Sequence, residues 1–266
     1  MASVLVTGAS RGIGLATARA LARRGHQVCA TVRDSAQARE LAAAAAGESL
    51  PISFVLMDVD SDASVQDVIS SLIDTDDVPD VLVNNAGIVR HGTIEETPLA
   101  DFRAAMETNY LGAIRCIQMV LPGMRKRGAG CIVNVSSVAG RVVNSPMGPY
   151  AASKFALEAM TEALAQEVRR FGIRVVLVEP GIIDTDMPRA VTHPRPDSAY
   201  PHGQRMAGYF SAALEAPVSP ALVADTIREI VEGSSWQFRY LVGPDAAPLV
   251  EGRAAMTDEE FIAGGS

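Results

Sequence analysis

Thr7-Gly8-Ala9-Ser10-Arg11-Gly12-Ile13-Gly14 follows the apolar run Val4-Leu5-Val6 and opens an Ala- and Leu-rich run that Gly25 ends. Glycines between a strand and a helix let the backbone turn tightly and approach a ligand closely. The free N–H groups and the positive dipole end of such a helix favour a pyrophosphate. A glycine-rich loop alone is about as often a plain turn, but here the flanking strand and helix favour a dinucleotide site.

The rest of the chain alternates short β-branched runs with longer amphipathic or Ala-rich runs. This alternation is typical of an α/β fold with a doubly wound parallel sheet and helices on both faces. No linker-like stretch divides the 266 residues, so we expect a single domain over 1–266. The seven expected strands cover residues 3–7, 27–32, 52–57, 81–84, 130–136, 173–178 and 238–242.

Two helices and one insertion stand out. Glycines end the helices expected over residues 12–24 and 150–171. Residues 185–220 break the alternation and are rich in Pro, His, Tyr and Met. Irregular insertions beyond the carboxyl end of a strand build ligand sites and lids in open α/β sheets, so we expect a substrate lid over about 185–220.

Composition excludes several classes of protein. A net charge of −8 and a pI near 5.1 argue against a nucleic-acid binder. No run of about eighteen apolar residues predicts a membrane span, and Met1-Ala2-Ser3 leads directly into the first strand without a signal-peptide pattern. Three cysteines without paired spacing suit a reducing compartment, and four scattered histidines form no metal-ligand pattern. We therefore expect a cytoplasmic protein with no metal site.

Pro149-Tyr150-Ala151-Ala152-Ser153-Lys154 places a phenol and an ammonium four residues apart at the start of a helical run. This spacing puts both groups on one helix face, where Lys154 lowers the pKa of the Tyr150 phenol. A phenol with a lowered pKa can donate or accept a proton near neutral pH. A solvated helix face explains most such pairs, so other motifs of the chain must show whether this pair is catalytic.

Three motifs together, Gly8-x-x-x-Gly12-x-Gly14, Asn84-Asn85-Ala86-Gly87 and Tyr150-x-x-x-Lys154, make the chain resemble the short-chain dehydrogenases/reductases. The match runs from Ser3 to about Thr185. This resemblance implies a Rossmann-type fold and hydride transfer between a nicotinamide and a carbonyl carbon. The chain is most similar to the 17β-hydroxysteroid and retinol dehydrogenase-like members, through the segments at residues 30–34 and 153–158.

The resemblance also implies the catalytic roles. Tyr150 is the proton donor in reduction and the base in oxidation, and Lys154 assists it and binds the nicotinamide ribose. Ser137 matches the residue that orients the substrate, with Ser136 as its alternative; successive strand residues point to opposite faces, so one of the two reaches the site. Asn109 matches the residue that holds a water in a proton relay. A turn hydrogen bond for the serine and a satisfied core amide for Asn109 are the structural alternatives.

The end of the second strand, Ala30-Thr31-Val32-Arg33, decides the cofactor. Val32 stands where NAD-binding members carry an acidic residue. Arg33 and Arg11 offer two guanidinium groups to a 2′-phosphate, so we predict NADP(H). The alternatives are that Asp34 reaches the ribose, which makes the site less selective, or that Arg33 is a solvated loop charge.

By the same resemblance, Asp58-Val59 contacts the adenine, the segment at 84–87 lines the adenosine side, and Pro180-Gly181-Ile182-Ile183-Asp184-Thr185 holds the nicotinamide carboxamide. The expected cofactor-binding residues are Gly8, Ser10, Arg11, Gly12, Ile13, Gly14, Arg33, Asp58, Val59, Asn85, Ala86, Gly87, Tyr150, Lys154, Pro180, Gly181, Ile183 and Thr185.

Apolar side chains on segments near the site favour a bulky apolar ketone, aldehyde or secondary alcohol as the small-molecule substrate, although such residues are more often plain core. They are Val142, Met147, Met187, Met206, Tyr209 and Phe210. Small residues at Ala156, Ala159 and Ala163 of the catalytic helix allow close packing against a second copy, and family members are usually homodimers or homotetramers. A dinucleotide-sensing regulator and a nucleotide-sugar epimerase or dehydratase are the rival functions.

Overall fold

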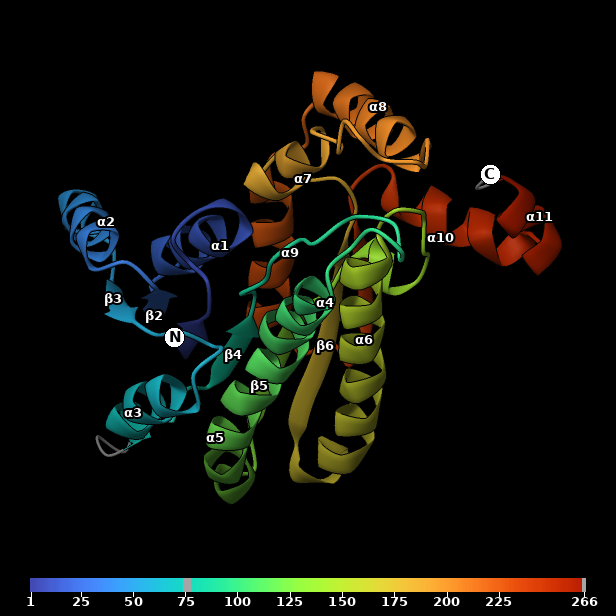
Figure 1. Ribbon diagram of the computed structural model, residues 1–266. Coiled ribbons are helices and arrows are strands. Elements are labelled where there is room, and N and C mark those ends of the chain that lie inside the picture. Colours follow the sequence, from blue (N-terminus) through green and yellow to red (C-terminus); the bar gives the residue numbers. More distant parts are fainter. Residues whose placement is uncertain (74–77, 265–266) are drawn as a thin grey trace.

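In the computed structural model, which describes residues 1–73 and 78–264, seven parallel strands form one sheet in the order β3-β2-β1-β4-β5-β6-β7 (Figure 1). The predicted α/β fold class is therefore confirmed, and each predicted strand lies within two residues of an observed one. The strands are β1 (Ser3–Val6), β2 (Gln27–Val32), β3 (Ile52–Leu56), β4 (Val81–Asn84), β5 (Gly130–Val135), β6 (Ile173–Pro180) and β7 (Arg239–Val242).

Helices connect the strands and cover the sheet. The first six are α1 (Gly12–Arg23), α2 (Ser35–Gly47), α3 (Asp62–Ile73), α4 (Leu99–Met106), α5 (Gly112–Arg127) and α6 (Gly148–Val168). The later ones are α7 (Asp186–Val191), α8 (His202–Glu215), α9 (Pro220–Glu232), α10 (Ala246–Ala255) and α11 (Asp258–Gly264). Three short helical segments are η1 (Glu107–Leu111, a π-helix), η2 (Val138–Gly140) and η3 (Arg169–Phe171).

Two apolar layers hold the helices on opposite faces of the sheet. Alternate strand residues point to opposite faces, so Val4 and Val6 pack with α1 and α9, whereas Leu5 packs with α3, α5 and α6. Both faces are covered, which explains why the strands read as continuous apolar runs. None of the described helices is long and apolar enough to span a membrane.

The order of the strands places the candidate site. β1 pairs with both β2 and β4, and the chain builds the sheet outward from β1 in both directions. Ligands of open α/β sheets bind beyond the carboxyl ends of the strands where the order reverses in this way. The glycine loop (residues 7–14) and the segment after β4 therefore meet at this edge.

The lid (residues 185–220) is more regular than its composition suggested. The prediction of an irregular insertion is wrong for about half of it, because α7 and α8 lie within it above the carboxyl edge of the sheet (Figure 1). Met206, Phe210 and Leu214 recur at helical spacing, which explains α8. The Pro-rich stretch at 194–201 separates the two helices.

Candidate active site

The glycine loop is shaped to approach a ligand with its backbone. Gly8 and Gly12 adopt left-handed φ angles of +65° and +55°, and a Cβ on Gly8 would lie 2.7 Å from Ala86 Cα. Arg11, at the N-cap of α1, makes no side-chain cap bond, so the N–H groups of the first turn remain available. Ser10 and Ile13 are half-buried in the same loop. This cradle fits the pyrophosphate of a dinucleotide.

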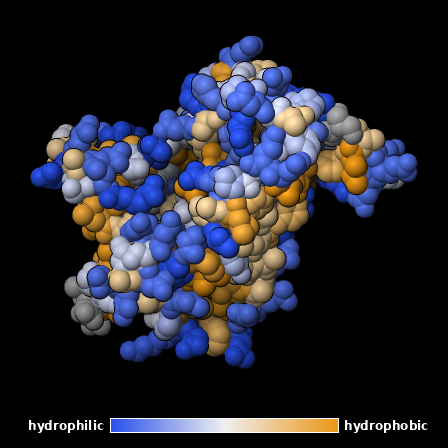
Figure 2. All heavy atoms as spheres, in the orientation of Figure 1, coloured by the Kyte–Doolittle hydropathy of each residue, from blue (hydrophilic) through white to orange (hydrophobic). Residues whose placement is uncertain are grey.

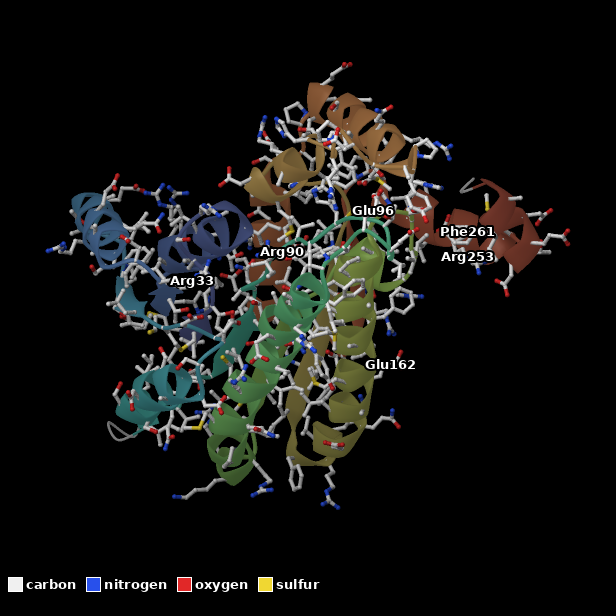
Figure 3. All side chains as sticks on the ribbon, in the orientation of Figure 1. Arg33, Arg90, Glu96, Glu162, Arg253 and Phe261 are labelled. Atoms are coloured by element: carbon white, nitrogen blue, oxygen red, sulfur yellow. The ribbon has the colours of Figure 1, made fainter. Side chains whose placement is uncertain are left out.

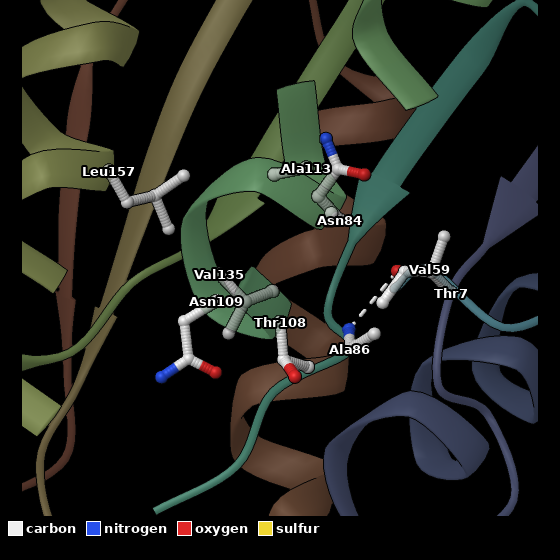
Figure 4. A pocket seen from close by; sticks show the side chains of 10 residues that line it. Thr7, Val59, Asn84, Ala86, Thr108, Asn109, Ala113, Val135 and Leu157 are labelled. Carbon is white, nitrogen blue, oxygen red and sulfur yellow. Dashed lines mark hydrogen bonds between the residues drawn. The ribbon is translucent and has the colours of Figure 1, made fainter. Parts of the chain in front are cut away.

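Partly buried hydrogen bonds join the glycine loop to the segment after β4. Thr7 Oγ1 accepts bonds from the N–H groups of Asn85 and Ala86, both 3.0 Å long, and Figure 4 shows the bond from Ala86. Asn85 Nδ2 donates to the carbonyls of Thr7 (2.9 Å) and Gly8 (3.0 Å). Sequence reasoning did not single out Thr7, whose only signal is a hydroxyl placed directly after a buried strand.

The end of β2 leaves one guanidinium available. Arg33 is exposed (Figure 3), and none of the described residues pairs with it. Asp34, the alternative ribose ligand, instead caps α2 by accepting a 2.7 Å bond from the N–H of Gln37. Arg11 Nε lies 3.0 Å from Asp186 Oδ2 in an exposed ion pair. Because such pairs are weak, Arg11 can exchange this partner for a phosphate.

The segment after β3 is ordered by its own polar groups. The N–H of Asp58 donates to Ser64 Oγ at 3.0 Å. Val59 is buried against Gly112 of α5 and lines a small internal pocket with Asn109 and other residues (Figure 4). Asp58 is half-buried, so it is the more accessible of the two residues predicted to contact an adenine.

Tyr150 and Ser137 meet beneath the lid. Tyr150 lies in the first turn of α6 and is buried, and Ser137 is the second residue after the end of β5. Burial raises the pKa of the Tyr150 phenol to about 12, and a hydrogen bond with Ser137 opposes that rise. Lys154 Nζ lies 5.8 Å from the centroid of the Tyr150 ring. The net shift of this pKa is upward, and burial and the hydrogen bond with Ser137 account for it. The lowering of the pKa by Lys154 stays a prediction.

Ser137, not Ser136, faces the site. Ser137 Oγ accepts a bond from the N–H of Ala139 (3.1 Å) and donates to the carbonyl of Pro180 (3.4 Å). Ser136 Oγ is buried on the opposite side, near Glu158. The alternation of side chains in the extended backbone just beyond β5 thus separates the two serines as expected.

Lys154 is buried one helical turn beyond Tyr150. Its Nζ donates to the carbonyl of Val135 at 2.9 Å. Burial lowers the pKa of Lys154 to about 8, whereas the charge of Glu158 raises it. Glu158 was not among the predicted site residues, and only its position four residues after Lys154 pointed to it.

Asn109 lies in the π-helix η1, a rare geometry that often marks functional sites. Its Oδ1 accepts a 2.8 Å bond from the N–H of Ile88. Its Nδ2 donates to the carbonyl of Ile88 and to Ser153 Oγ, both at 2.9 Å. The amide therefore ties the segment after β4 to α6, which matches the structural alternative; the predicted water relay stays a prediction.

The turn after β6 is supported from the C-terminal part of the chain. Asp245 Oδ2 accepts a 2.9 Å bond from the N–H of Ile182, and Asp245 Oδ1 lies against Gly181, where a side chain would collide with it. Ile183 is buried, and Thr185 Cγ2 would lie 3.1 Å from a Cβ on Gly12. The predicted carboxamide-binding turn therefore lies beside the glycine loop. Sequence reasoning did not identify Asp245.

The lid packs on Tyr150 through apolar side chains. Tyr150 clusters with Met147 and Val191, and further apolar residues pack against them. Those residues are Val89, Ala139, Met187, Met206 and Phe210. Tyr209 is 45% exposed and Val142 is buried outside this cluster, so four of the six predicted pocket residues gather here.

The comparisons with known proteins agree with this geometry. The short chain dehydrogenase family model matches residues 2–196. The chain belongs to the short-chain dehydrogenase family. A crystal structure of a short-chain dehydrogenase from Streptomyces avermitilis superposes on all of this chain and 98% of that chain, with a TM-score of 0.83 and 31% identity.

The names of two relatives state a substrate or a cofactor. This short-chain dehydrogenase is 43% identical over 189 residues to human retinol dehydrogenase 8, which covers 69% of this chain and 60% of that protein. It is 36% identical over 186 residues to the NADPH-dependent pterin aldehyde reductase of Arabidopsis thaliana, which covers 70% and 76%. The predicted resemblance to the retinol dehydrogenase-like members is thereby confirmed. This short-chain dehydrogenase is an oxidoreductase of a family that binds nicotinamide dinucleotides.

Proposed function

We propose that the protein is an NADP(H)-dependent oxidoreductase that interconverts a ketone or aldehyde with an alcohol, with Tyr150 as the general acid and base. The observation that carries this proposal is the convergence of Tyr150, Ser137 and Lys154 in a buried site at the carboxyl edge of the sheet. A buried, protonated phenol beside a hydroxyl can deliver a proton to a developing alkoxide, which is too unstable to form unaided.

The chain's own residues orient the substrate and move the proton. NADP(H), when bound, supplies or accepts the hydride. Ser137 Oγ holds the carbonyl oxygen beside the phenol, and the Tyr150 hydroxyl donates its proton to that oxygen during reduction. Because burial keeps this phenol protonated, the arrangement favours reduction. The apolar lid cluster excludes water from the reacting atoms.

Preference for NADP(H) over NAD(H) rests on the end of β2. Arg33 is exposed and free of described partners, while the Asp34 carboxylate is engaged at the N-cap of α2. A free guanidinium there attracts a 2′-phosphate, and the neighbouring Asp34 carboxylate is bound to the first turn of α2. The name of the NADPH-dependent pterin aldehyde reductase supports the same choice. Dissociation constants for NADPH and NADH test this preference, and tighter binding of NADH would contradict it.

The lid cluster favours a bulky apolar substrate. Four apolar side chains, Met147, Met187, Met206 and Phe210, lie beside Tyr150 or pack against its cluster. Methionines adapt to irregular apolar ligands because their side chains are flexible and polarisable. The similarity to a retinol dehydrogenase also fits a long apolar alcohol or aldehyde.

Loss of NADPH absorbance across a panel of ketones, aldehydes, steroids and quinones tests the reaction. Tyr150→Phe should lower turnover by about 10²–10⁴-fold, the usual contribution of a general acid, while NADPH still binds. Tyr240→Phe, on β7 away from the site, is the matched control and should retain full turnover. Turnover that survives in Tyr150→Phe would refute the role of Tyr150, and tight NADPH binding without any turnover would favour the rival regulator.

We also propose a homodimer or homotetramer built on α6. Figure 2 shows apolar side chains gathered over α5 and α6. On α6, Ala159 and Ala163 are exposed, Ala156 is half-buried, and Phe155 is 42% exposed. Small exposed residues beside an exposed aromatic ring suit close packing of two helices. Light scattering that finds only monomer would contradict this.

A reducing compartment such as the cytoplasm remains the expected location. The three cysteines, Cys29, Cys116 and Cys131, are free thiols in the structure. Burial raises the pKa of Cys116 to about 12 and that of Cys131 to about 11, so both are unreactive packing residues.

A further inference from the structure

A stripe of four ionisable residues runs along α6. Tyr150, Lys154, Glu158 and Glu162 recur every four residues and therefore lie on one side of the helix. The first three are buried, and Glu162 lies at the outer surface of α6 (Figure 3), where its side chain is 53% exposed. The reaction proposed above uses the first two residues and leaves Glu158 unexplained.

Glu158 belongs to a cluster of carboxylates and arginines, which we define as Glu158, Glu162, Glu179, Arg141 and Arg239. Glu158 Oε2 lies 3.2 Å from Arg239 Nη2, and Glu179 Oε1 lies 2.9 Å from Arg239 Nε. Glu162 Oε1 contacts the same guanidinium at 2.5 Å. Arg141, which follows Ser137 by four residues, reaches Glu179 at 3.3 Å. Three carboxylates thus share Arg239, and two of the three are buried.

The cluster leaves Glu158 only partly satisfied. Its Oε1 is buried without a hydrogen-bond partner, and Ser136 Oγ, which faces it across Gly140, is also unpaired. Burial and the neighbouring Glu179 raise the pKa of Glu158, whereas Ser136 and Arg239 oppose the rise. A buried carboxyl that gains a proton so readily changes charge near neutral pH, and its titration is coupled to that of its neighbours.

The charge of Glu158 acts on the ammonium of Lys154. Its Nζ donates to a carbonyl, Val135 O, and not to a carboxylate. Burial disfavours the charged ammonium, and Glu158, one helical turn away, is the group whose charge counteracts burial. Both residues are buried, so salt screens their interaction only weakly.

We propose that Glu158 is a positioning residue that acts on the reaction through Lys154: its carboxylate, held by Arg239 beside Glu179, keeps the proton on Lys154 Nζ. The inference rests on the proposed function for its link to turnover. The charge on Lys154, however, can be measured without any turnover.

The composition makes that measurement direct, because the chain contains two lysines, Lys126 and Lys154. In protein labelled with ¹³C-lysine, the pH dependence of the Lys154 Cε shift reports its pKa, and exposed Lys126 serves as the internal reference. Lys126→Arg assigns the two signals. Glu158→Gln should lower the pKa of Lys154 by about one unit, the lower end of effects from a neighbouring charge. Glu162→Gln, which removes an exposed carboxylate from the same arginine, is the matched control. It should change the pKa of Lys154 by no more than about a few tenths of a unit.

An unchanged Lys154 pKa in folded Glu158→Gln would overturn the proposal. Circular dichroism and the Lys126 signal establish that the variant is folded. If it does not fold, the wild-type titration decides: the Lys154 signal should move in two steps, first as Glu158 loses its proton and then as Lys154 does. A single step would overturn the proposal as well.

Turnover tests the consequence for the reaction. The alkaline limb of the kcat–pH profile should move to lower pH in Glu158→Gln by the same amount as the Lys154 pKa. Wild type and variant should converge at acid pH, where Glu158 is protonated in the wild type. A shifted Lys154 pKa with an unshifted limb would refute the link to catalysis. If no substrate is turned over, the proposed function fails while the labelled titration still decides the charge on Lys154.

Discussion

The glycine loop and the lid both lie at the carboxyl edge of the sheet, yet they are held by different kinds of contact. Thr7 and Asn85 bind backbone groups of the glycine loop and of the segment after β4 through four partly buried hydrogen bonds of 2.9–3.0 Å. The lid has an apolar inner surface and, outside it, polar contacts to one short loop, most of which are exposed. Glu96 of that loop accepts bonds from Ser198 Oγ at 2.7 Å and from the N–H of Ala199 at 2.8 Å.

This difference suggests that the glycine loop is rigid and that the lid is adaptable. A network of partly buried hydrogen bonds leaves little freedom, because breaking one of them leaves polar groups with limited access to water. Exposed polar contacts open at small cost, and apolar packing tolerates changes of shape. The cofactor side should therefore resist substitution, whereas the lid side should accept it and adjust to the substrate.

The largest effect is expected for Gly14→Ala in the glycine loop. A Cβ there would collide with Gly8 O and lie 2.5 Å from Asn85 Nδ2, so the two joined segments must separate. We expect NADPH affinity to fall by about 100-fold, equivalent to two hydrogen bonds of about 1.5 kcal/mol each. Fluorescence titration of NADPH measures it.

Gly208→Ala, in lid helix α8, is the matched control for that prediction. No described atom lies within 4 Å of a Cβ at this position. The helix propensity of Ala should stabilise α8 by up to about 1 kcal/mol, with NADPH affinity unchanged. Equal losses of affinity in the two variants would remove the contrast between the two sides.

Arg33→Ala should have the next largest effect. Loss of one charged contact to a 2′-phosphate should weaken NADPH binding by about 10-fold, from a charge-assisted hydrogen bond worth about 1.5–3 kcal/mol, and leave NADH binding nearly unchanged. The same titration with both cofactors measures this. Equal losses of affinity for NADPH and NADH would mean that Arg33 does not bind the 2′-phosphate.

Phe210→Ala should alter substrate choice more than cofactor binding. Removing a ring from the cluster around Tyr150 should lower kcat/KM for a bulky apolar carbonyl by about 10-fold, as expected for lost apolar contact of 1–3 kcal/mol. A small carbonyl substrate is the internal control and should be affected less. An equal loss for both substrates would show that Phe210 serves the fold and not the pocket.

The smallest effect should come from Glu96→Gln. Hydrogen bonds from Ser198 and Ala199 lower the pKa of Glu96, so its contribution is present above the ordinary carboxyl pKa and is lost as the pH falls through the lowered one. Backbone hydrogen exchange over residues 195–201 should quicken by at most about a few-fold, because contacts of a solvent-screened carboxylate are weak. Glu215→Gln, at the end of α8, should change nothing there. Unaltered exchange in Glu96→Gln would show that other contacts hold the lid.

The sequence predicted most of the fold for physical reasons. The inner strands, covered on both faces, had to be continuous apolar runs, and glycines stood where helices ended, as at Gly25 and Gly172. Tyr150 and Lys154 were visible because their spacing is local, within one turn of α6. The lid helices were missed because prolines and polar residues masked the helical spacing of α8.

The unpredicted parts of the site depend on contacts between distant segments. Glu158 meets Arg239, which lies 81 residues further along the chain. Asp245 binds the N–H of Ile182, 63 residues earlier. In each case the residue type allowed several partners, and only the packing of the strands selected one.

The support of the turn after β6 by Asp245 also bears on recombination between relatives. The family match ends at residue 196, yet Asp245 and Arg239 reach back from beyond it to Ile182 and Glu158. A chimera joined near residue 196 would separate these pairs and place foreign partners behind the reacting groups. Crossovers that exchange the lid alone, and rejoin the parental chain before β7, preserve both pairs and offer the safer route to new substrates.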